Sequence, residues 1–338
     1  MVGNHHAEGP AAIRLISAQA AERALDYPSL IQALREGHRA GVAASERLLI
    51  VQPGSGGAHD HLLTYAAWQR GRALGVKLAS VFPGNAETNL PTIASVFILF
   101  DGQTGVPLAV IEANPLTQRK TGADSALGAD YLARRDARTL LMVGAGKQAP
   151  AMVEAHRTVR PGLSRILIWN RTPAAAARLA AFLKGQRIDA ASVADLEAAA
   201  GTADVICCAT ASRTPILKGA WIKPGTHVDL VGSFTPEMRE TDDALMRRAR
   251  IYVDSRWFTL GVAGDLLQPV RDGVISEADI AGDLFDLAQG KTAGRQSDQE
   301  ITVFKNGGGG HLDLMTAQLI YARVGRKSLR GKQDAAAQ

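Results

Sequence analysis

The chain has 338 residues, of which 46% are hydrophobic and 5% aromatic, and it carries a formal net charge of +5. A chain of this length buries a full core as one large or two ordinary domains, so its stability requires no metal or disulfide framework. The modest positive charge suits anionic small molecules. The basic C-terminal segment "GRKSLRGKQDAAAQ" has no interleaved aromatic residues, so the sequence predicts no nucleic-acid surface.

The N-terminal sequence and the cysteines predict a cytoplasmic protein without a membrane segment. "MVGNHHAEGP" has neither the basic region nor the apolar region of a signal peptide. The apolar run "IASVFILF" is too short to cross a bilayer. Cys207 and Cys208 are adjacent in an apolar run. Since neighbouring strand residues point to opposite faces, we expect two reduced thiols there.

The first third of the chain predicts one helix followed by several strands. Residues 17–41 have helical periodicity and end at Gly41, and residues 47–52, 76–82, 92–101 and 106–113 predict strands. "DGQTG" predicts the turn of a hairpin between the last two. The segment that contains His59, Asp60 and His61 predicts a hairpin connection. Two histidines at this spacing without a third ligand do not predict a metal site.

Strands and helices alternate from residue 121 onward. Helical patterns at 122–135, 148–159, 173–184 and near Leu196 alternate with strand patterns at 139–144, 165–170, near 188, 204–210, 227–232 and 250–254. This alternation predicts an α/β fold with a doubly wound parallel sheet. Two helical segments follow "AGDLLQP", and the second starts near Leu312. We expect the sheet to be complete at residue 254 and the last helix to return to the first domain.

The first strand of this series ends in a glycine motif, "VGAGKQA". Gly144 suits a tight turn, Gly146 allows a ligand to approach the backbone, and Ala149 provides the small residue that helix–strand packing needs. Ala145 and Gln148 complete the turn. Because a strand precedes the motif and a helix follows it, the motif predicts a pyrophosphate site at a helix N-terminus, as in dinucleotide-binding proteins.

The second strand of the series ends in Trp169, Asn170, Arg171 and Thr172. Enzymes that bind NAD place a carboxylate here for the ribose 2′-hydroxyl. This chain offers a guanidinium and a hydroxyl, which suit a 2′-phosphate. We therefore expect Asn170, Arg171 and Thr172 to bind the nucleotide and to favour NADPH, with NADH as the alternative.

Six segments in order resemble the ornithine cyclodeaminase/mu-crystallin family: "GVKLASVFPGN", "LTQRKTGADSALGADYLARRDARTLLMVGAGKQA", "ILIWNRT", "VDLVGSFTPEMRE", "AGDLLQP" and "EITVFK". The resemblance covers residues 41–322. It implies a homodimer with a Rossmann domain at 123–310 and a substrate-binding and dimerisation domain formed from 1–122 and 311–338. It also implies hydride transfer between a nicotinamide and a carbon that bears nitrogen and a carboxylate.

The same resemblance implies a cationic substrate site. Arg47 matches a carboxylate-binding arginine, and Lys77 matches the substrate lysine, which could also relay a proton to the imine nitrogen. The third cation of the family is usually an arginine, but Lys120 stands at that position here, directly after Arg119. Either Lys120 binds the carboxylate as a point charge, or Arg119 assists it.

Further cofactor contacts follow from the resemblance and from the carboxyl ends of the later strands. The expected residues are Ala209, Thr210, Gly232, Ser233, Lys305 and Asn306. After Asn306 the chain continues into four glycines, a loop that is either looser than in the family or closer to the cofactor. The sequence leaves this open, and it leaves Asp265 as either a family motif residue or a helix cap.

Phe234 distinguishes the activities within the family. Ornithine cyclodeaminases have an aspartate at the matching position, and a phenyl ring can neither pair with an ammonium nor accept a proton. The sequence therefore predicts the reduction of a cyclic ketimine, Δ1-pyrroline-2-carboxylate to L-proline and also Δ1-piperideine-2-carboxylate to L-pipecolate. The alternatives are an ornithine cyclodeaminase, an open-chain amino-acid dehydrogenase and a non-catalytic NADP-binding protein.

Overall fold

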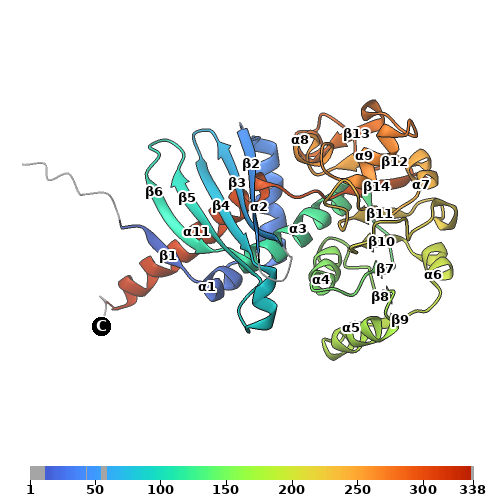
Figure 1. Ribbon diagram of the computed structural model, residues 1–338, viewed down its shortest axis with the longest axis horizontal. Coiled ribbons are helices and arrows are strands. Elements are labelled where there is room, and N and C mark those ends of the chain that lie inside the picture. Colours follow the sequence, from blue (N-terminus) through green and yellow to red (C-terminus); the bar gives the residue numbers. More distant parts are fainter. Residues whose placement is uncertain (1–11, 43, 55–58, 336–338) are drawn as a thin grey trace, which may run out of the picture. The chain divides into compact units, whose positions relative to one another are not determined.

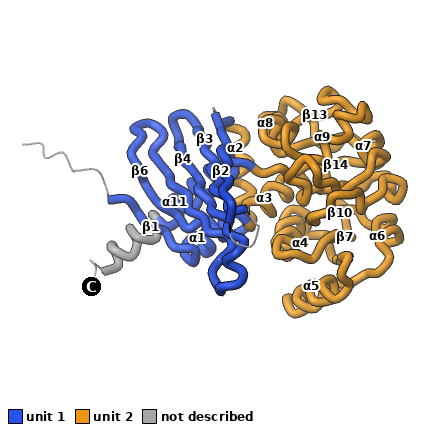
Figure 2. The backbone as a smooth tube through the Cα atoms, in the orientation of Figure 1, with its two compact units in different colours: residues 1–26, 41–117, 309–338 blue, residues 27–40, 118–308 orange. Residues whose placement is uncertain are grey.

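The computed structural model describes residues 12–42, 44–54 and 59–335 (Figure 1). The chain divides into two compact units, which Figure 2 shows in different colours. Unit 1 comprises residues 1–26, 41–117 and 309–338, and unit 2 comprises residues 27–40 and 118–308. Within the described residues, no helix has both the length and the apolar character of a membrane span.

Unit 1 is a mixed six-stranded sheet with the strand order β1-β6-β5-β4-β3-β2. Strand β1 pairs with β6 in parallel, and the other neighbours are antiparallel. Helix α11 packs on β2, β3, β4 and β5, and Figure 1 shows it lying across the sheet. The elements of unit 1 are β1 (Arg14–Ile16), α1 (Ala18–Arg23), β2 (Ala44–Pro53), β3 (His59–Gln69), β4 (Ala73–Val81), the 3-10 helix η2 (Pro83–Glu87), β5 (Ile93–Asp101), β6 (Pro107–Glu112) and α11 (Gly310–Ala335).

The predicted hairpin between β5 and β6 is confirmed. Asp101 Oδ1 accepts hydrogen bonds from the backbone N–H groups of Gln103 at 3.0 Å and Thr104 at 2.8 Å. Gly105 then adopts a φ of 72°, a left-handed conformation that glycine takes without a steric penalty. Aspartate at the start and glycine at the end of the turn therefore explain this local structure.

The sequence pattern does not predict strand β3. Its first residues, His59, Asp60 and His61, lie in the segment that is predicted as a hairpin connection, but they pair with Pro53, Gln52 and Val51 of β2. The segment begins with polar residues and contains small alanines, so its alternation is weak. Pairing with β2 and β4 on its two sides makes it a strand, and this is a tertiary effect that local propensity does not contain.

Unit 2 is a parallel eight-stranded sheet with the order β13-β12-β14-β11-β10-β7-β8-β9, so the predicted doubly wound fold is confirmed. Its strands are β7 (Thr139–Val143), β8 (Arg165–Trp169), β9 (Ala190–Ser192), β10 (Val205–Cys208), β11 (His227–Leu230), β12 (Ala249–Val253), β13 (Ile280–Asp283) and β14 (Ile301–Lys305). Its helices are α2 (Tyr27–Ala40), α3 (Asn114–Leu132, which begins in unit 1), α4 (Ala149–Val159), α5 (Pro173–Gly185), α6 (Leu196–Thr202), α7 (Asp243–Arg248), α8 (Arg256–Thr259), α9 (Gly264–Arg271) and α10 (Leu284–Ala288), with the 3-10 helices η3 (Gly219–Trp221) and η4 (Glu277–Asp279).

The expectation that this sheet is complete at residue 254 is wrong. Strands β13 and β14 follow that position, and β14 inserts between β11 and β12. All five residues of β14 are buried, as expected for an interior parallel strand covered on both faces. A late segment therefore supplies an interior strand, and its carboxyl end leads into the glycine run.

Successive strand residues in unit 2 enter different cores. Leu141, Val143 and Cys208 belong to one cluster, whereas Leu140, Met142 and Cys207 belong to the other. This alternation explains why the strands are apolar throughout, since both faces of the sheet are covered. Cys207 and Cys208 are both free thiols, as predicted. Burial raises the pKa of both thiols well above the usual range, so they stay protonated.

The segment 17–41 forms two helices, and the second belongs to unit 2. Helix α2 packs against α10 and α4, and the His38 ring lies 4.7 Å from the Phe285 ring. The predicted domain boundaries at 122/123 and 310/311 placed residues 27–40 in the first domain, which differs from the two units of the structure. The expectation that the last helix returns to the first domain is confirmed by α11.

Candidate functional site

The glycine motif forms a tight turn between β7 and α4. Gly144 has a φ of 106° and donates its N–H to the Trp169 carbonyl at 2.9 Å. A Cβ at Gly144 would lie 2.6 Å from the carbonyl oxygen of Ala209, so only glycine fits. A Cβ at Gly146 would meet nothing within 4 Å. The turn therefore leaves space beside Gly146 and before the N-terminus of α4, where a pyrophosphate can accept backbone hydrogen bonds.

The end of β8 connects directly to this turn. Asn170 Oδ1 accepts a hydrogen bond from the Ala145 N–H at 3.2 Å, and Asn170 Nδ2 donates to the Thr172 carbonyl at 3.0 Å. Arg171 and Thr172 are exposed, and Thr172 is the N-cap residue of α5 without a side-chain capping bond. A guanidinium and a hydroxyl thus lie in solvent beside the glycine turn, where the second strand of a dinucleotide fold places the ribose.

A buried carboxyl group that the sequence did not point out holds the ends of β10 and β11 together. Glu240 accepts from the Thr210 N–H at 2.7 Å and the Thr210 hydroxyl at 2.8 Å through Oε1, and from the Gly232 N–H at 2.7 Å through Oε2. Burial, reinforced by the nearby Asp265, raises the pKa of Glu240 to about 8. The expected cofactor residues Thr210 and Gly232 are therefore positioned by Glu240.

Asp265 does not cap a helix. Its Oδ1 accepts from the Glu240 N–H at 2.8 Å, and its Oδ2 lies 3.7 Å from the Lys305 ammonium. Lys305 is fully buried and donates to the Leu230 carbonyl at 3.0 Å. Ser233 is also buried, and its hydroxyl donates to the Met238 carbonyl at 2.8 Å. These side chains tie the loops at the ends of β11 and β14 to α9.

The start of the glycine run is firmly bonded. The N–H groups of Gly307 and Gly308 donate to Asp254 Oδ2 at 2.9 and 2.6 Å. A Cβ at Gly307 would collide with the Thr259 side chain. Asn306, just before, donates to the Thr121 carbonyl at 3.1 Å and the Ser125 hydroxyl at 3.0 Å. Of the two alternatives for this loop, a looser segment does not apply to Gly307 and Gly308.

Arg47 and Lys77 lie on the same face of the unit 1 sheet. Tyr65 of β3 pairs directly with Arg47 of β2 and with Lys77 of β4. Residues directly opposite in antiparallel strands project to the same face, so these three side chains form one row. Arg47 is exposed and Tyr65 is half-buried. The structure therefore brings two predicted carboxylate-binding cations together, with a tyrosine between them that the sequence did not reveal.

Lys77 is a buried cation with a carboxylate partner. Its ammonium lies 2.9 Å from Asp313 Oδ2 in the first turn of α11 and 4.8 Å from the centre of the Tyr65 ring. The exposed fractions of the two charged side chains are 8% and 0%. Asp313 lies within the apolar stretch "HLDLM". An acidic residue in an apolar stretch is the sequence signal that could have indicated a buried ion pair here.

Arg119 and Lys120 of α3 have different surroundings. The Arg119 guanidinium donates to both Glu154 oxygens of α4, at 3.1 and 3.0 Å, and its carbon lies 4.9 Å from the centre of the Tyr27 ring. Lys120 is buried, and its charge opposes the rise in the pKa of Asp124 that burial and Asp254 cause. Arg119 is thus engaged with Glu154. The choice between Lys120 and Arg119 as the third cation stays a prediction.

Phe234 lies in the loop after β11, and 61% of its surface is exposed. Ser233 before it is buried. The phenyl ring is therefore not part of the unit 2 core. An exposed aromatic ring at the carboxyl edge of a parallel sheet lies where ligands of such folds bind.

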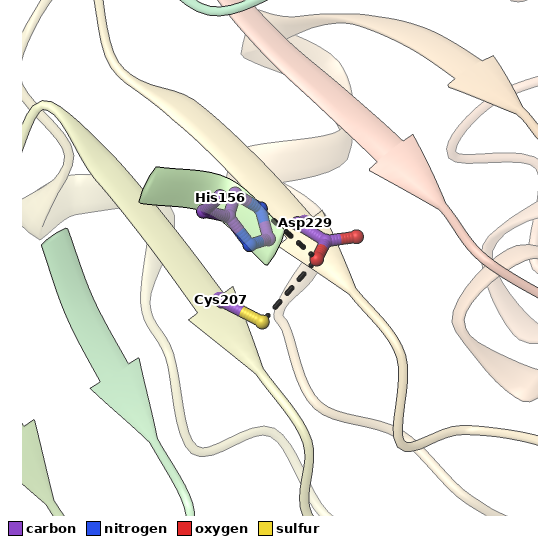
Figure 3. Close-up of side chains that lie close together, drawn as sticks. All are labelled: His156, Cys207 and Asp229. Atoms are coloured by element: carbon purple, nitrogen blue, oxygen red, sulfur yellow. Dashed lines mark hydrogen bonds and ion pairs between the residues drawn. The ribbon is translucent and has the colours of Figure 1, made fainter. Parts of the chain in front are cut away.

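A second polar cluster lies inside unit 2 (Figure 3). Asp229 of β11 accepts from the Cys207 thiol at 3.2 Å through Oδ2 and from the Ser125 hydroxyl at 3.0 Å through Oδ1, and His156 Nε2 lies 3.5 Å from Oδ2. Among the described residues, His156, Cys207 and Asp229 are the one group with the ligand types and spacing of a metal site. Hydrogen bonding accounts for their contacts, since Asp229 satisfies the buried thiol and hydroxyl.

Comparisons with known proteins show the family that this chain is similar to. The model of the ornithine cyclodeaminase/mu-crystallin family matches residues 59–328. The Delta(1)-pyrroline-2-carboxylate reductase of Paracoccus denitrificans is 45% identical over 300 residues, which are 89% of this chain and 93% of that protein.

Two solved structures have a similar fold. The Thermococcus litoralis Delta(1)-pyrroline-2-carboxylate reductase in complex with NADH and L-proline has a TM-score of 0.84 at 30% identity, covering 94% of this chain and 98% of that one. An archaeal alanine dehydrogenase dimer with bound NAD has a TM-score of 0.83 at 27% identity, covering 94% and 97%.

The doubly wound sheet and its glycine turn define a Rossmann-type dinucleotide-binding protein with a second unit built from both chain ends. The chain belongs to the ornithine cyclodeaminase/mu-crystallin family. The resemblance of the six sequence segments is thereby confirmed.

Proposed function

We propose that this protein is an NAD(P)H-dependent reductase of cyclic ketimine carboxylates that converts Δ1-pyrroline-2-carboxylate to L-proline. The observation that carries the proposal is its 45% identity, over 89% of the chain, to the reductase of Paracoccus denitrificans with this substrate in its name. A solved relative with 30% identity binds NADH and L-proline, a nicotinamide cofactor and the expected product. The enzyme is therefore an oxidoreductase that acts on a C=N bond.

The residues of unit 2 fit a nicotinamide dinucleotide. The space at Gly146 and the N-terminus of α4 suit the pyrophosphate, and Asn170 supports the turn through Ala145. A bound nicotinamide supplies the hydride for the reduction. We further propose a preference for NADPH, supported by the exposed Arg171 and Thr172 and by the lack of a carboxylate at the end of β8.

We propose that three cations, Arg47, Lys77 and Lys120, bind the substrate carboxylate. The row formed by Arg47, Tyr65 and Lys77 supports this role for Arg47 and Lys77. Fixing the carboxylate orients the imine carbon for attack, and orientation provides much of the rate in such reactions. Lys77 is also our candidate for the proton that reaches the imine nitrogen, because its ammonium is a donor.

Phe234 supports a cyclic and uncharged substrate skeleton. Ornithine would bring a second ammonium, which needs a carboxylate partner once it leaves water. A pyrroline ring carries no distal charge and gains from contact with a phenyl ring. The six-membered Δ1-piperideine-2-carboxylate is a second substrate in this proposal, since one methylene in an apolar site is worth only about 1–3 kcal/mol of discrimination.

A paired assay on one preparation tests the function. We expect NADPH oxidation with Δ1-pyrroline-2-carboxylate and formation of proline, together with background release of ammonia from L-ornithine with NAD. Release of ammonia without ketimine reduction would instead identify a cyclodeaminase. A strict requirement for added ammonia during NADPH oxidation would identify an open-chain dehydrogenase, and cofactor binding without turnover on any imine would identify a non-catalytic protein.

The carboxylate role of Lys77 has its own test. Lys77→Met removes the charge and keeps a similar length. We expect the KM for the ketimine to rise or kcat to fall, with NADPH affinity unchanged, because one charge-assisted hydrogen bond is worth about 1.5–3 kcal/mol. Wild-type kinetics in this variant would remove Lys77 from the site.

We also propose that the protein is a homodimer. Strand β2 is at the edge of its sheet, and Leu48, Leu49, Ile50 and Val51 are all exposed on it. Such an apolar edge is a pairing surface in folded proteins. Ile50→Lys is expected to lower the molar mass in light scattering to that of the monomer, and an unchanged mass would exclude this edge as the dimer contact.

A cytoplasmic location stays a prediction from the sequence.

A further inference from the structure

We propose that Asp313 is a positioning residue of the reductase, which fixes the Lys77 ammonium through a buried ion pair and directs it on the sheet face that carries Arg47. The inference rests on the proposed function, because it gives Lys77 the task of binding the substrate carboxylate. It adds a residue from the last helix of the chain to the row of Arg47, Tyr65 and Lys77.

Burial makes a counter-charge necessary. The Lys77 side chain is 8% exposed, and a charge removed from water is costly unless an opposite charge lies close to it. Asp313 Oδ2 is 2.9 Å from the ammonium, and its side chain is 0% exposed. At this distance, the attraction between the two charges offsets the hydration that both lose on burial. A pair at the surface keeps most of its hydration and does not depend on this attraction.

The elements around Lys77 contribute different groups. Its neighbour on β5 is the buried and apolar Phe97. Its neighbour on β3 is Tyr65, whose ring centre lies 4.8 Å from the ammonium, and Arg47 of β2 follows in the same row. Helix α11 contributes Asp313 and, two residues earlier, the buried His311. Arg47 is a like charge, so the negative charge of Asp313 also offsets its effect on Lys77.

The pairing is compatible with substrate binding. An ammonium has three N–H donors, and Asp313 occupies one direction while the Tyr65 ring occupies another. A carboxylate can accept from a remaining donor. Without Asp313, Lys77 would lose the contact that fixes the direction of its ammonium on this face of the sheet.

A double-mutant cycle tests the pair without any substrate. Lys77→Met, Asp313→Asn and the double variant are compared with the wild type by thermal unfolding at pH 7. We expect each single variant to lower Tm, and the double variant to lower it by less than the sum of the two losses, because both single changes break the same buried ion pair.

Asp26→Asn is the matched control. Asp26 pairs with Arg323 of the same helix α11, at an exposed place. This variant makes the same chemical change and loosens the same helix, but it does not touch Lys77. Its effect on Tm should be small and should not depend on Lys77. Additive losses for Lys77→Met and Asp313→Asn would overturn the proposal.

The second readout is the split between KM and kcat with Δ1-pyrroline-2-carboxylate. In Asp313→Asn we expect the KM for the ketimine to rise by about ten-fold or more with NADPH affinity retained, because the ammonium that binds the carboxylate is no longer fixed in place. An unchanged KM in a folded Asp313→Asn variant would overturn the proposal. If Asp313→Asn does not fold, Asp313→Glu keeps the charge, and its KM should lie closer to the wild-type value than that of Lys77→Met. A KM in Asp313→Glu as high as in Lys77→Met would also count against the proposal. A wild type that reduces no ketimine would refute the proposed function instead, while the unfolding cycle still decides the pairing.

Discussion

Replacing Glu240 with alanine is expected to destabilise unit 2 and to weaken cofactor binding. Glu240 accepts hydrogen bonds from the backbone N–H groups of Thr210 and Gly232, each at 2.7 Å, inside a fully buried environment. Alanine leaves these two donors without a partner. An unsatisfied buried donor costs about 1–3 kcal/mol, so we expect a loss of about 2–6 kcal/mol in the free energy of unfolding.

The loss should depend on pH in a defined direction. Burial and Asp265 raise the pKa of Glu240 to about 8 from an ordinary value of 4.5. A carboxyl group with a raised pKa contributes stability that is complete below the unfolded value and is lost as pH rises through the folded value. The difference between the wild type and Glu240→Ala should therefore narrow as pH rises through about 8.

Urea unfolding followed by circular dichroism at pH 6, 7, 8 and 9 measures this difference, and titration with NADPH measures the effect on the loops that carry Thr210 and Gly232. Glu197→Ala is the control, because Glu197 is exposed in the first turn of α6 and should change stability by only a few tenths of a kcal/mol. A loss below about 1 kcal/mol for Glu240→Ala at pH 7, or a loss that widens above pH 8, would refute the reasoning.

Three further predictions concern other parts of unit 2. Burial lowers the pKa of His38 from 6.5 to about 4. The free energy of unfolding should therefore fall by about 3 kcal/mol as pH falls from 6.5 to below 4. His38→Phe should flatten this pH dependence in urea unfolding, and an equally steep loss in the variant would contradict the prediction. Gly144→Ala should lower both Tm and NADPH affinity, because its Cβ would lie 2.6 Å from the Ala209 oxygen. Gly146→Ala should lower only the NADPH affinity, and equal Tm losses in the two variants would contradict the prediction. Arg171→Ala should reduce the ratio of kcat/KM for NADPH to that for NADH, and a wild type that prefers NADH ten-fold or more (about 1.4 kcal/mol) would remove the NADPH assignment.

The sequence by itself determined the features that depend on neighbouring residues. The turn at Gly144 follows from a strand, two glycines and a helix in succession. The hairpin between β5 and β6 follows from Asp101 and Gly105, because its hydrogen bonds and its left-handed residue lie within the five residues 101–105. The continuous apolar strands after residue 139 predict burial on both faces, and the two cores of unit 2 have this form. Family membership also needed no structure, because six ordered segments carried it.

Only the tertiary structure decided the features in which distant segments meet. Strand β14 takes an interior place between β11 and β12, although it follows both in the chain. Strand β3 exists because β2 and β4 pair with it. Glu240 reaches back to Thr210, and Asp313 pairs with Lys77 across more than two hundred residues. Hydrogen bonds and ion pairs depend on distance in space, and local propensity contains no information about which remote partner a buried polar group will find.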